Sequence, residues 1–170
     1  ARIIDALTQE NNLDTINLDI SFKNLQKIEN KRSEAIKNQR LISSDEDFVK
    51  ASISHNGEKY KCEVRLKGDL PDHWSVDRIS LRVEMKNDNI YGLSDFSLQR
   101  HGTRQDTGQW LYLQSLKKEG LMAVDYYFVN FFLNGKHLGV YGLEGHFSKD
   151  IFEKNKKRES VILSFDESKY

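Results

Sequence analysis

Two stretches rich in apolar, aromatic and β-branched residues are each interrupted by an Asn-Gly pair. Residues 125–150 contain a series of aromatic side chains before Asn134-Gly135 and further apolar residues after it. Residues 48–68 alternate apolar and polar positions around Asn56-Gly57. An Asn-Gly pair between two such runs is the strongest short-range signal of a β-hairpin. The sequence therefore predicts two hairpins.

Three other segments have helical character. The apolar positions between Asn17 and Leu41 fit helical spacing and the polar residues among them are good helix formers, so we expect one long amphipathic helix there. Residues 107–119 predict a second helix, which Gly120 ends. A short helix is expected near residues 148–154.

The remaining regular segments are strands. Strict alternation over residues 79–85 predicts a strand with one apolar face. Shorter strands are expected at residues 96–98 and 161–165. Together these elements predict an α+β fold, in which a few helices cover a twisted, mainly antiparallel sheet.

The composition limits the classes of partner. The chain has 170 residues, of which 38% are hydrophobic and 31% are charged, as expected of one domain with a core. Its 26 basic and 26 acidic residues cancel, so we expect no nucleic-acid partner and no membrane contact from this segment. The single cysteine, Cys62, excludes an internal disulfide and a multi-cysteine metal site.

A pair of strand cations is the best candidate for chemistry. Arg65 and Lys67 are two residues apart on a predicted strand, so their side chains lie on one face, and Gly68 follows them. Two cations that end at a glycine form a plausible phosphate cradle. Arg82 lies on the polar face of the strand at 79–85 and could likewise contact nucleotide phosphates. The alternative for all three is a charged face in contact with solvent.

Other residue patterns point to no catalytic centre. The five histidines show no metal-ligand spacing, and we identify no metal ligand and no catalytic residue. The aromatic runs at 126–128 and 131–132 favour a core strand. A carbohydrate-binding module is the alternative for these runs, and it would require several exposed aromatic side chains on one face.

Taken together, several segments resemble the spore-coat CotH kinase-like family, an atypical branch of the protein-kinase fold. The matching segments, in the family's order, are VRLKGD at 64–69, SLRV at 80–83, YGLSDFSL at 91–98, Gly102-Thr103-Arg104, the helix with Trp110-Leu111, and LNGKHLGVY at 133–141. The last is the most specific, because an Asn-Gly-x-x-x-Gly-x-Tyr hairpin is typical of the family. The resemblance covers about residues 48–167.

The resemblance implies a kinase N-lobe-like domain over residues 48–170, preceded by an N-terminal helical extension over residues 1–47. It also implies that the chain stops before the catalytic half, so that the chain alone is inactive. The phosphates of ATP, bound with Mg²⁺ or Mn²⁺ in a full-length parent, would be contacted by Arg65, Lys67 and Arg82, with Glu144 in the same site.

On this interpretation the parent phosphorylates Ser or Thr of a protein substrate. Its partners would be a nucleotide and a protein of a bacterial coat or envelope, and its location the spore coat, the envelope or the exterior. Two positions depart from the family pattern, because Gln109 and Gly145 stand where relatives carry acids. They leave open a second interpretation, a non-catalytic, pseudokinase-like assembly module of a coat or envelope.

Overall fold

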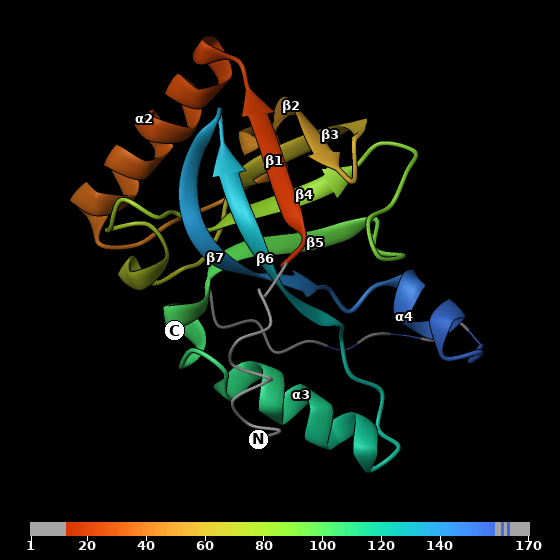
Figure 1. Ribbon diagram of the computed structural model, residues 1–170. Coiled ribbons are helices and arrows are strands. Elements are labelled where there is room, and N and C mark those ends of the chain that lie inside the picture. Colours follow the sequence, from red (N-terminus) through yellow and green to blue (C-terminus); the bar gives the residue numbers. More distant parts are fainter. Residues whose placement is uncertain (1–12, 159–160, 162, 164–170) are drawn as a thin grey trace, which may run out of the picture.

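Seven strands close into a barrel in the computed structural model, which describes residues 13–158, 161 and 163. The order of neighbouring strands is β1-β2-β3-β4-β5-β7-β6, and β6 returns to β1. Their bounds are β1 Thr15–Ile20, β2 Val49–His55, β3 Glu58–Leu66, β4 Leu81–Met85, β5 Asp95–Arg100, β6 Tyr126–Leu133 and β7 Lys136–Gly145 (Figure 1).

Strand β1 closes the barrel. It pairs antiparallel with β2 and parallel with β6, and it lies between them in Figure 1. Ile16, Leu18 and Ile20 are buried, and the residues between them are less so. This is the period of two that a strand requires. The predicted helix from Asn17 is therefore wrong over β1 and begins only at Phe22.

The predicted fold class, an α+β sheet of kinase N-lobe type with a few covering helices, is wrong. The sheet is a closed seven-stranded barrel because β1 supplies partners to both β2 and β6. Closure leaves no sheet edge with unpaired backbone groups, and it lets one side of every strand face an enclosed core.

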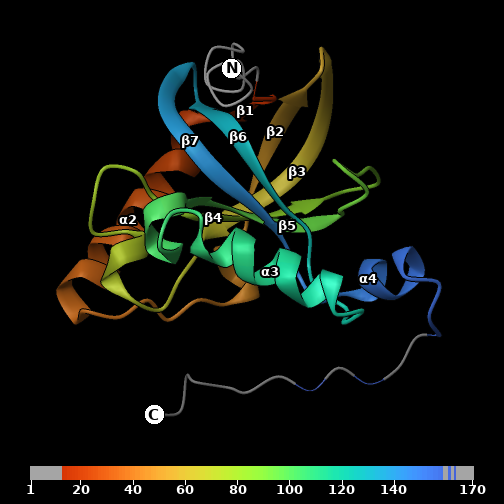
Figure 2. The same ribbon diagram turned by 60° about the horizontal axis from the view of Figure 1, so that its bottom comes forward.

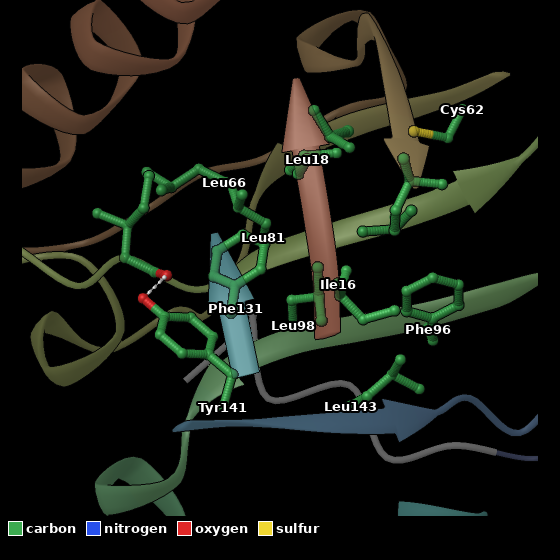
Figure 3. Packing of buried hydrophobic residues seen from close by; sticks show 14 of the residues in the cluster. Ile16, Leu18, Cys62, Leu66, Leu81, Phe96, Leu98, Phe131, Tyr141 and Leu143 are labelled. Atoms are coloured by element: carbon green, nitrogen blue, oxygen red, sulfur yellow. Dashed lines mark hydrogen bonds between the residues drawn. The ribbon is translucent and has the colours of Figure 1, made fainter. Parts of the chain in front are cut away.

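The barrel interior holds the main core. Its buried members come from all seven strands and include Ile16, Leu18, Ile53, Val64, Leu66, Leu81, Val83, Phe96, Leu98, Val129, Phe131, Tyr141 and Leu143 (Figure 3). Tyr141 is fully buried, and its hydroxyl donates to the Ile79 carbonyl at 3.1 Å. The hydroxyl of this buried ring thus has a hydrogen-bond partner inside an apolar core.

The helices lie outside the barrel. Helix α2 (Phe22–Asn38) buries Ile28 and Ala35 against the main core, whereas α3 (Gly108–Lys118) and α4 (Lys149–Lys154) form a second apolar cluster with β6. In Figure 1, α2 lies to the left of the barrel, and α3 and α4 lie below it. Figure 2 brings α3 and α4 forward. Among the described residues, no helix combines the length and apolar character needed to cross a bilayer.

The two predicted Asn-Gly hairpins are confirmed as β2–β3 and β6–β7. The helices predicted at 107–119 and 148–154 are confirmed as α3 and α4. Tyr126 and Phe131 are buried, so the aromatic runs belong to core strands, as predicted. The strand predicted at 161–165 falls mostly outside the described residues, and so do residues 1–12 of the expected N-terminal extension.

Candidate functional site

A row of polar side chains crosses the outer face of the barrel. Register pairs Arg65 of β3 with Arg82 of β4, Arg82 with Ser97 of β5, and Ser97 with Glu144 of β7. Residues paired in register point to the same face and stand side by side. Their strand neighbours Val64, Leu81 and Leu98 point inward to the core, as alternation requires.

Lys67 is positioned by one acid and one amide, and a second amide holds the acid. Its Nζ donates to Gln99 Oε1 at 3.2 Å and lies 3.7 Å from Glu144 Oε2. Gln99 Nε2 donates to Glu144 Oε2 at 2.5 Å, and Gln109 Nε2 of α3 donates to Glu144 Oε1 at 3.2 Å. Gln99 is fully buried and Glu144 is nearly so. Both carboxylate oxygens therefore have donors, and Lys67 is held at the face by a partner on β7.

Arg82 is neutralised by its own neighbours. Its Nη2 donates to Asp95 Oδ2 at 2.5 Å, and its Nε lies 3.5 Å from Glu84 Oε1. Asp95 and Glu84 belong to β5 and β4, so this arginine has two acids within ion-pair distance. The charge of Arg82 is thus largely compensated within the chain.

Arg65 has no direct ion-pair partner among the described residues, and Glu84, Asp47 and Asp45 offset its charge only from longer range. Its guanidinium lies over the Phe48 ring, 5.2 Å from the centroid, and its Nη1 donates to the Leu66 carbonyl at 3.2 Å. Among the described residues no carboxylate lies within ion-pair distance of it, and its Nε is buried without a hydrogen-bond partner. Burial and, next, the charge of Arg82 lower the pKa of Arg65 from its ordinary value. Like charges directly opposite each other destabilise a strand pair.

These cations line a cleft of about 300 Å³, which we call the basic cleft. This volume is at the lower end of known ligand sites, about 300–1,000 Å³. The residues that line it are Ser43, Arg65, Lys67, Gly68, Asp69, Leu70, His73, Arg82 and His146.

His146 closes one side of the basic cleft. Its Nε2 lies 2.6 Å from Ser97 Oγ, and Ser97 is fully buried. Burial, followed by the positive charges of Arg82, Lys67 and Arg65, lowers the pKa of His146 to about 3. The imidazole is therefore neutral at pH 7, and the side of the cleft it forms adds no charge to that of the three cations.

The low pKa of His146 should give the fold a measurable pH dependence. In the unfolded chain this group returns to an ordinary pKa of about 6.5, so the unfolded state binds more protons between that value and about 3. The unfolding free energy therefore falls as the pH drops below about 6.5. We expect His146→Asn to flatten this slope by up to about 1.4 kcal/mol per pH unit in urea titrations. Identical slopes for the two proteins would contradict this assignment.

The four residues predicted to contact the nucleotide come together, although in two roles. Arg65, Lys67 and Arg82 line the basic cleft, whereas Glu144 lies behind Lys67 and fixes it. Gln109 stands where relatives carry an acid, and in this chain Glu144 is the acid that pairs with Lys67.

Sequence reasoning missed Gln99 and Asp95, and for His146 it noted only that the five histidines show no metal-ligand spacing. Asp95, Ser97 and Gln99 alternate with apolar residues on β5, and this alternation is the signal that could have found their polar face.

The site does not contain a metal centre of its own. In the described part of the chain, no group of three or more His, Cys, Asp or Glu is placed to hold a metal ion. Among the residues that line the basic cleft Asp69 is the single acid, and the acids behind it are already engaged, Glu144 by Lys67 and two amides and Asp95 by Arg82. The residues present therefore do not fit a protein-held Mg²⁺ or Mn²⁺ ion.

Comparison with known proteins adds no relative. The chain matches no model of a protein family, and no curated protein matches it.

Proposed function

We propose that this chain binds phosphate groups in the basic cleft, and that its ligand is a nucleotide, ATP by the CotH resemblance. The observation that carries the proposal is the register pair of Arg65 and Arg82, in which Arg65 is partly buried, its Nε has no hydrogen-bond partner, and no carboxylate of the described residues lies within ion-pair distance of it. An anion between the two guanidinium groups would relieve their repulsion and supply acceptors for buried N–H groups. Lys67 adds a third cation on the same side.

The electrostatics of the cleft favour phosphate over a metal or a neutral ligand. Arginine presents a planar fork that matches phosphate oxygens, and lysine contributes a point charge. A partly buried site strengthens both interactions relative to solvent. The overall charge of the chain is zero, so this attraction is local to the cleft.

We assign phosphate contacts, and not phosphoryl transfer, to these residues. Transfer needs a group that orients or deprotonates the attacking hydroxyl. Both oxygens of Glu144 accept hydrogen bonds from amides, and Asp95 Oδ2 accepts one from Arg82, so we assign neither carboxylate the role of a base. In the kinase interpretation the transfer step would be performed by other parts of a longer parent.

We expect ATP and inorganic tripolyphosphate to bind the chain in isothermal titration calorimetry at low ionic strength. Arg65→Gln should weaken both by about 10- to 100-fold, because a charge-assisted hydrogen bond contributes about 1.5–3 kcal/mol. Lys61→Gln is the matched control, because it removes one positive charge from an exposed position on the same strand outside the cleft. Equal weakening by both variants, or no binding by the wild-type chain, would overturn the proposal.

A second candidate function is a non-catalytic assembly module of a bacterial coat or envelope. One observation favours it: Leu111 and Tyr112 of α3 are 54% and 61% exposed, and Leu121 and Phe147 are more than half exposed as well. Contiguous exposed apolar side chains mark protein-contact sites, and of these four residues Tyr112 and Phe147 line the same pocket beside α3. If assembly is the function, the chain should self-associate or bind its partner without ATP, and Leu111→Ser with Phe147→Ser should abolish this in sedimentation velocity.

A further inference from the structure

His146 lies where three cavities meet. It lines the basic cleft, a cavity of about 290 Å³ between α3, α4 and the start of β6, and an apolar pocket of about 440 Å³ beside α3. We propose that His146 is a proton-linked specificity residue of the basic cleft: it is neutral without ligand, takes up a proton when a polyanion binds, and then acts as a fourth cationic group. This inference rests on the proposed phosphate-binding function.

The hydrogen-bond partner of His146 permits both protonation states. Ser97 Oγ lies 2.6 Å from His146 Nε2. A hydroxyl can donate to an imidazole nitrogen or accept from an imidazolium N–H by rotating its own hydrogen. An ammonium group at this place would have favoured the neutral ring only, because it can donate a hydrogen bond but cannot accept one. The ring can therefore gain a proton without losing its bond to β5.

The charges facing the ring towards the basic cleft are three cations. Arg65 and Lys67 come from β3 and its end, and Arg82 comes from β4. Three carboxylates lie on this side: that of Asp69 lines the basic cleft, and those of Asp95 and Glu144 are hydrogen-bonded to a cation or an amide. Burial of the ring and, next, the positive charges of Arg82, Lys67 and Arg65 keep the imidazole neutral, with a pKa of about 3.

On its other side the ring faces a cluster of two lysines and one aspartate. Lys117 of α3 and Lys154 of α4 both donate to the carboxylate of Asp125, just before β6. This cluster carries one excess positive charge and lines the cavity between α3 and α4. It cannot supply the anion that an imidazolium needs, so that anion has to come from a ligand in the basic cleft.

A bound polyanion would reverse the field at His146. A ligand with several negative charges would offset Arg65, Lys67 and Arg82 together, and the remaining charge would stabilise the imidazolium. A singly charged anion would offset only part of the field. The cleft should therefore prefer di- and triphosphates to singly charged anions, and their affinity should rise as the pH falls, by at most about tenfold per pH unit for one linked proton.

Proton uptake can be measured directly. Tripolyphosphate is titrated into the full chain near pH 6 in two buffers with different ionisation enthalpies, and the difference between the observed enthalpies gives the protons taken up. We expect wild-type chain to take up more protons than His146→Asn, whose amide can keep the Ser97 bond. Protonation of the ligand itself is common to both proteins and cancels in the comparison.

Each outcome decides a separate point. Equal uptake by the two proteins, with binding intact, overturns the role of His146 and leaves the phosphate-binding function standing. No binding by wild-type chain overturns both. If His146→Asn does not fold, the ring-proton NMR signal of His146 in wild-type chain decides, because its titration should move to higher pH in saturating tripolyphosphate. The His137 signal, from the opposite end of β7, should not respond.

Discussion

Glu144→Ala should lower the unfolding free energy by about 3 kcal/mol, because it removes one member of a largely buried ion pair. The side chains of Glu144 and Lys67 are 12% and 19% exposed. In the variant, little water could therefore reach the Lys67 ammonium to replace the lost carboxylate. The amides of Gln99 and Gln109 would lose their acceptor at the same time. Urea denaturation of the two proteins measures the difference.

The chain contains a matched control for this prediction. Glu63 of β3 lies 2.6 Å from Lys86, but these side chains are 25% and 50% exposed. Glu63→Ala should therefore cost less than about 1 kcal/mol, as exposed ion pairs do. A loss for Glu144→Ala no larger than for Glu63→Ala would contradict the buried network. Glu144→Leu combined with Lys67→Met should recover part of the loss, since no buried charge is then left alone.

The local elements of the fold could be predicted because their signals are local. The Asn56-Gly57 and Asn134-Gly135 turns each have two successive residues with positive φ, which is the conformation that Asn-Gly favours. The closure of the barrel could not be predicted in this way. It depends on β1 pairing in parallel with β6, more than a hundred residues away in the chain, and no local pattern reports such a pairing.

The cations of the site could be predicted from the sequence, but the residues that contact them could not. Alternation alone places Arg65 and Lys67 on one face, and Arg82 on the polar side of its own strand. That Arg65 stands opposite Arg82 depends on the register of β3 and β4. That Lys67 meets Glu144 depends on β5 lying between β4 and β7, which is a property of the sheet order.

The hairpin motif that carries the family resemblance has a structural role in this chain. Gly139 has a φ of 89° at the register shift between β6 and β7, and a Cβ there would come 2.9 Å from Arg78 Nη1. Tyr141 ties β7 to the Ile79 carbonyl inside the core. Asn134 reaches across to β1, where its Oδ1 accepts from Ile20 N at 2.7 Å and its Nδ2 donates to Ile20 O at 2.9 Å. Each of these residues stabilises the barrel rather than contacting the basic cleft.

Asn134→Ala should therefore destabilise the chain by about 3 kcal/mol, of which about 2 come from the two lost hydrogen bonds and about 1 from alanine at positive φ. The loss is expected to appear first as faster amide hydrogen exchange in β1, because these two bonds hold the end of the strand that closes the barrel. Urea denaturation gives the total, and exchange measured by NMR gives the location.

The second Asn-Gly turn provides the control that separates these two contributions. Asn56 has a φ of 52° and Asn134 a φ of 48°, so replacement by alanine introduces the same backbone strain at both turns. Asn56 makes no comparable side-chain bonds among the described residues, so Asn56→Ala should cost only about 1 kcal/mol. The difference between the two variants then measures how strongly the amide of Asn134 stabilises barrel closure. Equal losses would show that the turn alone accounts for the effect, and that closure depends on the β1–β6 backbone ladder and the core beneath it.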